Sequence, residues 1–180
     1  MKLTSINRYH PLISILHWLM AFTFVFMIVS GEFMDDTLES ELFHWHTQIG
    51  FTMLILIFLR LSSALLTHRT HNASLFSKNE ERLACATKIG LYIVMFLIPF
   101  TGWLMTIFEP RLQPTEYLGL VNWPVLQSVL SNHEQFEVLE EVHEFCVKVL
   151  IGLTALHVAG YFKHLIVDKV NLLAVFRFKP

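Results

Sequence analysis

Four histidines in this 180-residue chain have a spacing that could build metal sites: His17, His46, His143 and His157. His143 and His157 are 14 residues apart. In an α-helix that spacing is a rise of ~21 Å, with the two side chains only ~40° apart in direction. These imidazoles would therefore lie on one helix face at two depths. Neutral imidazole is a common ligand for iron and other transition metals, so the spacing allows two separate centres.

The composition indicates which elements carry these histidines. The chain is 54% hydrophobic and 16% charged, with a formal net charge of −2 and a mean hydropathy of +0.52. This balance excludes a basic nucleic-acid-binding protein and a disordered chain. Charge-poor stretches of roughly 20 residues predict helices that cross a membrane. We expect one all-α domain over residues 1–180, an integral membrane four-helix bundle with helices at about 11–33, 42–67, 88–108 and 143–166.

Consecutive spans run in opposite directions, and this sets the depth of each histidine. His46 opens the second helix at the surface where the fourth helix begins, which is the level of His143. His17 lies 14 residues before Gly31 at the end of the first helix, and so ~21 Å below that surface. This is the level of His157. The spacing therefore predicts two stacked pairs, His46 with His143 and His17 with His157.

Two stacked pairs of this kind are the arrangement that would hold two b-type haems in a four-helix bundle. The chain has no C-x-x-C-H motif, so the expected haems are non-covalent. With histidine at both axial positions, such haems transfer electrons and leave no open position for oxygen or substrate. The expected metal ligands are His17, His46, His143 and His157.

Two more residues of the second helix fall on the face of His46. Gly50, one turn later, would let a porphyrin edge approach the backbone. Arg60, 14 residues after His46, would place a cation at the level of His17. There it either pairs with a haem propionate or snorkels to the membrane surface. Both residues are candidate cofactor-binding residues.

The other histidines leave alternatives open. His44 is the rival of His46 as a ligand, two residues earlier and pointing ~200° away. His10 and His164 each lie seven residues outward from the ligand on the same helix. They are either solvated interface residues or contacts to a proton or a propionate near a quinone. Three others are expected at the surface: His68, His71 and His133.

Local patterns near the fourth span predict further structure. Ser131-x-x-Glu134 fits a capping box, so a helix should begin there and run directly into the fourth span. A short surface helix is expected over residues 125–130. Lys148 should pair with Glu144, one helical turn earlier.

Charge asymmetry predicts the orientation in the membrane. Most lysines and arginines lie in the N-terminal tail, the second connection and the C-terminal tail. The opposite side is acidic and has only Arg111 and Lys148 as cations. By the positive-inside rule both termini are cytoplasmic. The His17–His157 level would then be the cytoplasmic one.

Several motifs together resemble the bacterial cytochrome b561 family, over about residues 8–164: Arg8-Tyr9, His17-Trp18, His46-x-x-x-Gly50, Arg60-Leu61, Pro99-x-x-Gly102-Trp103, His143-Glu144 and His157. The resemblance implies a four-helix protein of the bacterial inner membrane with two haem b groups. It also implies the same four histidine ligands. The ligand scheme is similar to that of the cytochrome b subunits of nickel hydrogenases and formate dehydrogenases. Some relatives oxidise superoxide at the outer face and reduce ubiquinone.

We therefore expect a di-haem cytochrome that transfers electrons between a donor at the outer face and the quinone pool, with no nucleic-acid partner. Superoxide is a narrower expectation for the donor, and the acidic outer face counts against steering an anion there. The alternative is a haem-bearing membrane anchor that docks a separate oxidoreductase at the acidic connection between residues 109 and 141. A metal-ion transporter is the weakest alternative, because two ligands per level are too few for a tetrahedral zinc site.

Overall fold

The computed structural model describes residues 11–34, 41–66, 77–108, 117–120 and 133–170. Its helices are α1 (Pro11–Phe33), α2 (Glu41–Leu66), α3 (Lys78–Phe108) and α4 (His133–Ile166). All four are long and apolar enough to cross a membrane. This confirms the all-α, four-span architecture. Helices suit a bilayer because each backbone N–H and C=O finds its partner within the same segment.

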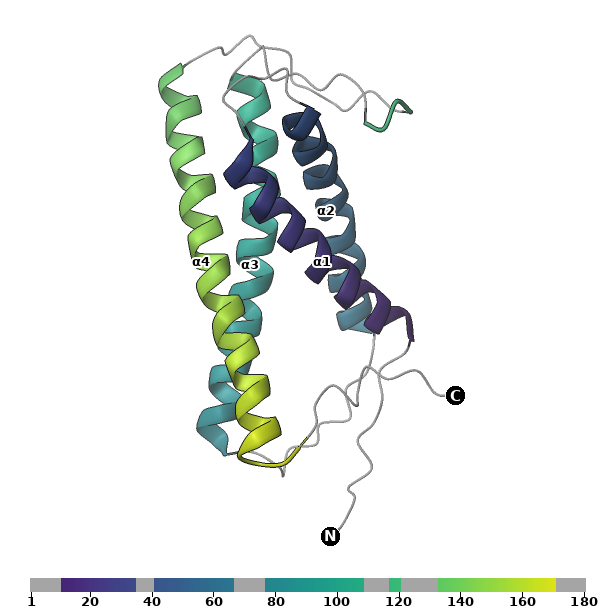
Figure 1. Cartoon of the computed structure of the whole chain (residues 1–180), viewed down its shortest axis with the longest axis vertical. Coiled ribbons are helices and arrows are strands. Elements are labelled where there is room, and N and C mark those ends of the chain that lie inside the picture. Colours follow the sequence, from purple (N-terminus) through teal and green to yellow (C-terminus); the bar gives the residue numbers. More distant parts are fainter. Residues whose placement is uncertain (1–10, 35–40, 67–76, 109–116, 121–132, 171–180) are drawn as a thin grey trace.

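The four helices run alternately up and down (Figure 1). α3 and α4 lie side by side along their length, α1 packs on α2, and α2 packs on α3. α1 crosses the bundle at an oblique angle, and it packs little against α4. Any close contact between α1 and α4 therefore depends on individual long side chains.

Two apolar clusters hold these helices together. The first joins α1 to α2: Leu16, Met20, Met53, Leu56 and Ile57. The second joins α3 to α4: Val94, Ile98, Cys146 and Leu150. Phe24 of α1 and Met95 of α3 pack against both clusters. These two side chains therefore link the two helix pairs into one bundle.

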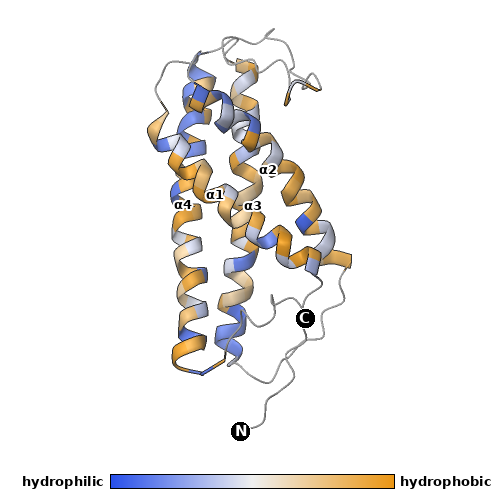
Figure 2. Cartoon of the chain, turned by 45° about the vertical axis from the view of Figure 1, so that its right-hand side comes forward, coloured by the Kyte–Doolittle hydropathy of each residue, from blue (hydrophilic) through white to orange (hydrophobic). Residues whose placement is uncertain are grey.

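Apolar residues also cover the outside of the bundle. Figure 2 shows hydrophobic colour along much of the helices, with hydrophilic colour at the lower end of α3 and the upper end of α4. Large side chains such as Phe22, Phe58 and Phe145 are exposed. A contiguous apolar surface of this extent needs an apolar solvent. The chain is therefore a multi-pass membrane protein.

Two helices extend beyond their charge-poor stretches. α3 begins at Lys78 rather than near residue 88. α4 begins at His133 and continues without a break into the charge-poor stretch near residue 143, as the sequence predicts. Counting charges detects the part of a helix that lies in hydrocarbon, whereas the helix itself continues to its cap. Ser131 and residues 125–130, where further local structure was expected, lie outside the described residues.

The start of α3 has a capping box that the sequence analysis missed. The Ser77 N–H and hydroxyl both donate to Glu80 Oε2 at 2.9 Å, and the Glu80 N–H donates back to Ser77 Oγ at 3.4 Å. This reciprocal arrangement satisfies backbone donors that a helix start otherwise leaves unpaired. It explains why α3 begins so far before its apolar stretch.

A charged group, here called the end cluster, joins the lower ends of α3 and α4. Lys163 forms ion pairs with Glu80 and with Asp168, the latter at 2.8 Å between Nζ and Oδ2. His164 Nδ1 lies 2.6 Å from Asp168 Oδ2. Hydrogen bonds from Lys163 and then from His164 hold the pKa of Asp168 below its ordinary value of 3.8. The cluster fastens the end of α4 to the start of α3.

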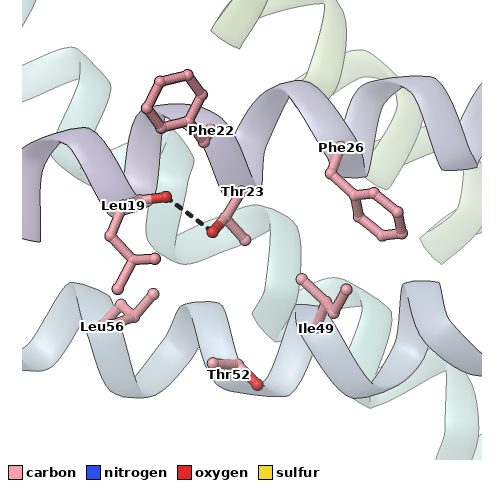
Figure 3. Close-up of a pocket in the computed structure, with 7 residues that line it drawn as sticks. All are labelled: Leu19, Phe22, Thr23, Phe26, Ile49, Thr52 and Leu56. Carbon is pink, nitrogen blue, oxygen red and sulfur yellow. Dashed lines mark hydrogen bonds between the residues drawn. The ribbon is translucent and has the colours of Figure 1, made fainter.

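An apolar groove of about 360 Å³ lies between α1 and α2 (Figure 3). Its lining comes from both helices: Leu19, Phe22, Thr23, Phe26, Ile49, Thr52 and Leu56. The Thr23 hydroxyl donates to the Leu19 carbonyl at 2.8 Å, so it is satisfied within its own helix. The lining includes none of the four candidate histidines.

Candidate functional site

His17 of α1 and His157 of α4 face each other across the bundle, and we call them the lower pair. Their ring centroids are 6.5 Å apart, and the ring planes are inclined by 61°. The His17 ring also contacts the ring of Trp18, at a centroid distance of 5.7 Å. Because α1 and α4 otherwise pack little against each other, these two side chains bridge helices that are distant in the sequence.

The separation of the lower pair fits two imidazoles bound to one metal ion. A bond from metal to imidazole nitrogen is about 2.0–2.1 Å, and the nitrogen lies roughly 1.1 Å from the ring centre, so opposed ligands have centroids about 6.3 Å apart. The observed distance is 6.5 Å. Each ring plane can rotate about its metal–nitrogen axis, so an inclination of 61° is compatible with this arrangement. The donor set therefore fits a bis-imidazole iron.

Arg60 of α2 lies at the level of the lower pair. Its positive charge acts on His17, and its side chain is half-buried. The Ser63 hydroxyl donates to the Arg60 carbonyl at 2.7 Å, within the same helix. The structure thus places a cation beside the lower pair. Whether this cation binds a propionate or snorkels stays a prediction.

His46 of α2 rests against the end of α1. Its Nδ1 lies 2.8 Å from the Ser30 hydroxyl oxygen. A Cβ added to Gly31 would lie only 3.3 Å from His46 Cε1, which is tighter than ordinary van der Waals contact. A glycine at this position therefore lets the ring lie against the α1 backbone.

His143 of α4 meets α3 in the same way. Its Nδ1 lies 3.1 Å from Thr101 Oγ1. A Cβ added to Gly102 would lie 3.4 Å from His143 Cε1. Both rings are thus received by a hydroxyl residue followed by glycine. We call these dipeptides the hydroxyl–glycine steps: Ser30-Gly31 on α1 and Thr101-Gly102 on α3.

His46 and His143 lie at one level near the end of the bundle where α2 begins, and we call them the upper pair. They are near enough for their charges to interact. His44, the rival of His46, is exposed, and its ring contacts the neighbouring Trp45 at a centroid distance of 6.1 Å. His46 is half-buried and directed at α1. The geometry therefore favours His46 over His44 as the partner of His143.

Gly50 has an ordinary environment. A Cβ added there would lie 3.5 Å from the Met27 methyl group, a normal van der Waals distance. The expected approach of a porphyrin edge at Gly50 stays a prediction. The indole N–H of Trp103 on α3 is buried without a hydrogen-bond partner among the described residues. An indole N–H can donate a hydrogen bond to a carboxylate oxygen, such as that of a haem propionate.

Two of the remaining histidines lie among the described residues near the ends of α4. His133 is exposed and pairs with Glu137 at 3.3 Å, as expected for a surface residue. His164 belongs to the end cluster. Three others lie outside the described residues: His10, His68 and His71.

Sequence reasoning missed three residues that contact the upper pair: Ser30, Gly31 and Thr101. A signal was present, because each hydroxyl–glycine step lies at the depth of the histidine it receives. The pattern alone is short and common, and only its depth on the neighbouring helix makes it informative.

A comparison with protein families agrees with this geometry. The family model described as prokaryotic cytochrome b561 matches residues 8–178, which include all four helices and both histidine pairs. No curated protein matches the chain. The chain therefore belongs to the prokaryotic cytochrome b561 family, which transfers electrons in the membrane with b-type haem.

Proposed function

We propose that this chain is a di-haem cytochrome that carries single electrons across the inner membrane, between a donor at the outer face and the quinone pool. The lower pair binds one haem and the upper pair binds the other. The observation that carries the proposal is the 6.5 Å separation of the His17 and His157 rings. A bound haem supplies a one-electron iron couple, and two imidazoles per iron leave no position for a substrate ligand.

The vertical separation of the pairs supports transfer across the membrane. His143 and His157 are 14 residues apart on α4, which is ~21 Å of helix rise. The hydrocarbon core is about 30 Å thick. Two centres at these depths divide the crossing into shorter electron-transfer steps, so the role of the helices is to hold the centres at fixed levels.

The charges support an orientation. Cations gather at the end formed by the start of α3 and the end of α4: Lys78, Arg82, Lys88, Lys163 and Lys169. Lys148 lies toward the other end and pairs with Glu144 at 3.1 Å, as the spacing predicts. By the positive-inside rule the cation-rich end is cytoplasmic. The lower pair is then the cytoplasmic centre, and both termini lie on that side.

The number of haems per chain in variants of His46 and of its neighbour His44 tests the proposal. The purified wild type should contain two low-spin bis-imidazole haems per chain. His46→Ala should lose one haem, whereas His44→Ala should keep both, because the His44 ring faces Trp45. A folded wild-type chain that is haem-free after growth with ample haem would overturn the proposal. Haem loss in His44→Ala alone would reassign the ligand.

A second candidate function is suggested by the acidic start of α4. Its exposed carboxylates cover several turns: Glu134, Glu137, Glu140, Glu141 and Glu144. Such a surface attracts a soluble redox protein with a basic docking face. The chain would then be the haem-bearing anchor of a separate oxidoreductase. Reduction of this chain by a basic soluble cytochrome should slow as the salt concentration rises. If adding such a partner does not increase the rate at which the purified chain reduces ubiquinone, this role is excluded.

The same acidic surface bears on superoxide as the donor. Superoxide is an anion, and carboxylates repel it over roughly one Debye length. We expect superoxide to reduce the haems slowly in stopped-flow measurements, and Lys148→Gln to leave the rate unchanged. A fast reaction that depends on Lys148 would establish superoxide as a donor.

A further inference from the structure

We propose that Ser30 and Thr101 are positioning residues that hold the ligands of the upper pair in one tautomer and thereby lower the reduction potential of the upper haem. The inference rests on the proposed function, because it takes His46 and His143 as haem ligands. It concerns residues of the neighbouring helices, which touch the histidines rather than the metal.

The direction of the first hydrogen bond follows from the role of His46 as a ligand. When Nε2 of a neutral imidazole binds a metal, the ring proton is on Nδ1. Nδ1–H then donates to the Ser30 hydroxyl oxygen, which lies 2.8 Å away. The Ser30 hydroxyl keeps an acceptor for its own proton, because the Met27 carbonyl oxygen lies 3.1 Å from Oγ.

Thr101 leads to the same conclusion on the other side of the bundle. Its hydroxyl donates to the Leu97 and Ile98 carbonyls, both at 2.9 Å. Its oxygen can therefore accept from His143 Nδ1–H, at 3.1 Å, when Nε2 binds a metal. Two different helices thus support the same tautomer in the two histidines.

The hydroxyl–glycine steps also fix how each ring is rotated. One edge of the ring is held by the hydroxyl, and the adjacent Cε1 lies against the glycine. Ser30 is 1% exposed and Thr101 is 5% exposed, so water does not compete for either hydroxyl. A ring held at two points has little rotational freedom. The steps therefore define both the tautomer and the plane of each ligand.

This arrangement has an electronic consequence. An acceptor on Nδ1–H makes a ligating imidazole more basic. A more basic ligand stabilises ferric iron relative to ferrous iron, so it lowers the potential of the one-electron couple, in which no bond forms or breaks. Removal of either hydroxyl should therefore raise the potential of the upper haem.

The test is a redox titration of the full-length haem-loaded protein, with dithionite as reductant and ferricyanide as oxidant. Thr101→Val and Ser30→Ala each remove one hydroxyl with little change in volume. Thr101→Ser restores the hydroxyl. Matched controls are Thr23→Val and Thr106→Val, because those hydroxyls donate to the Leu19 and Trp103 carbonyls of their own helices at 2.8 and 2.7 Å.

In Thr101→Val and Ser30→Ala we expect one haem to shift to a higher potential and the other to stay unchanged. At a fixed ambient potential its ratio of oxidised to reduced iron should fall about threefold to tenfold, where tenfold is ~59 mV for one electron. The electron paramagnetic resonance signal of the same haem should move. Thr101→Ser and both controls should match the wild type.

Three outcomes would count against one or the other part of the argument. If both removal variants keep their haems and neither ratio changes by more than about twofold, the positioning role is wrong and the haem assignment stands. If Thr101→Ser behaves like Thr101→Val, packing rather than the hydroxyl is responsible, and the inference fails. A wild type without haem would overturn the proposed function itself. Haem loss in Thr101→Val with retention in Thr101→Ser supports the inference.

Discussion

In the upper pair each ring lies against a hydroxyl–glycine step of the adjacent helix, whereas in the lower pair the rings face each other across 6.5 Å. The upper rings belong to interfaces between directly packed helices, α1 with α2 and α3 with α4. The lower rings connect α1 with α4, which otherwise pack little. His143 is half-buried, while His157 is exposed.

This difference separates two ways of building a ligand pair. Helix packing orients the rings of the upper pair without any cofactor, so their geometry should depend on the neighbouring side chains. The lower histidines contact each other across helices that otherwise pack little, with Phe24 of α1 as a further link to the α3–α4 cluster. Their geometry should therefore depend mainly on the two rings themselves and on the metal. The end cluster assists the lower pair, because it fastens the end of α4 to α3 below His157.

The largest effect should come from His157→Ala, which removes half of the lower pair. We expect complete loss of one haem. We also expect weaker packing of α1 against α4, which would show as faster proteolysis of the chain in detergent. His143→Ala should also lose one haem while α3 and α4 stay packed through Val94, Ile98 and Leu150. The control is His164→Asn, which should keep both haems. Equal proteolysis in the two alanine variants would contradict the distinction between the pairs.

Gly31→Ala should loosen the upper haem by crowding its ligand. The new Cβ would lie 3.3 Å from His46 Cε1, so the ring must move, and haem affinity should fall on the order of tenfold. Haem transfer to an excess of apomyoglobin measures this change. Gly152→Ala is the matched control, since a Cβ there has no atom within 4 Å. Gly152→Ala should keep both haems. A similar loss of haem affinity in Gly31→Ala and Gly152→Ala would mean that the close approach at Gly31 has no special role.

Arg60→Gln should change the potential of the lower haem alone. A nearby cation disfavours the ferric form, so its removal should lower the reduction potential. The shift should be smaller than ~59 mV, which corresponds to a tenfold change in the ratio of oxidised to reduced iron. Lys148→Gln provides the comparison, because Lys148 is exposed and already paired with Glu144 at 3.1 Å. A shift of the upper haem in Arg60→Gln would show that the arginine does not act at the level of His17.

Asp168→Asn should have the smallest effect, through the pH dependence of stability. Lys163 and then His164 hold the pKa of Asp168 below 3.8, so its contribution is present above that pH and is lost as the pH falls through the lowered value. The thermal midpoint of the wild type should therefore drop below about pH 4. The thermal midpoint of Asp168→Asn should be lower than that of the wild type at neutral pH, and it should fall less as the solution is acidified. Identical pH profiles would show that the end cluster does not stabilise the fold.

Much of the architecture could be predicted because the bilayer limits the choices. Charge-poor stretches had to be helices, and the fixed rise per residue placed His17 and His157 at one depth. The extension of α3 could also have been found, since Ser77 and Glu80 form a capping box that is visible in the sequence. The rotation of each helix about its axis could not be predicted. A helix that is apolar on every side has no polar face to indicate which side chains point into the bundle.

The number of spans, the relative depth of the four candidate histidines and the segregation of cations follow from the amino-acid sequence, since they depend on helix rise and on the cost of charge in hydrocarbon. The inward direction of His46 rather than His44, and the position of Ser30 and Thr101 beside the upper pair, required the packed structure. Those features depend on helix rotation and on the close approach of two backbones. Packing sets both, through side chains that are far apart in the chain.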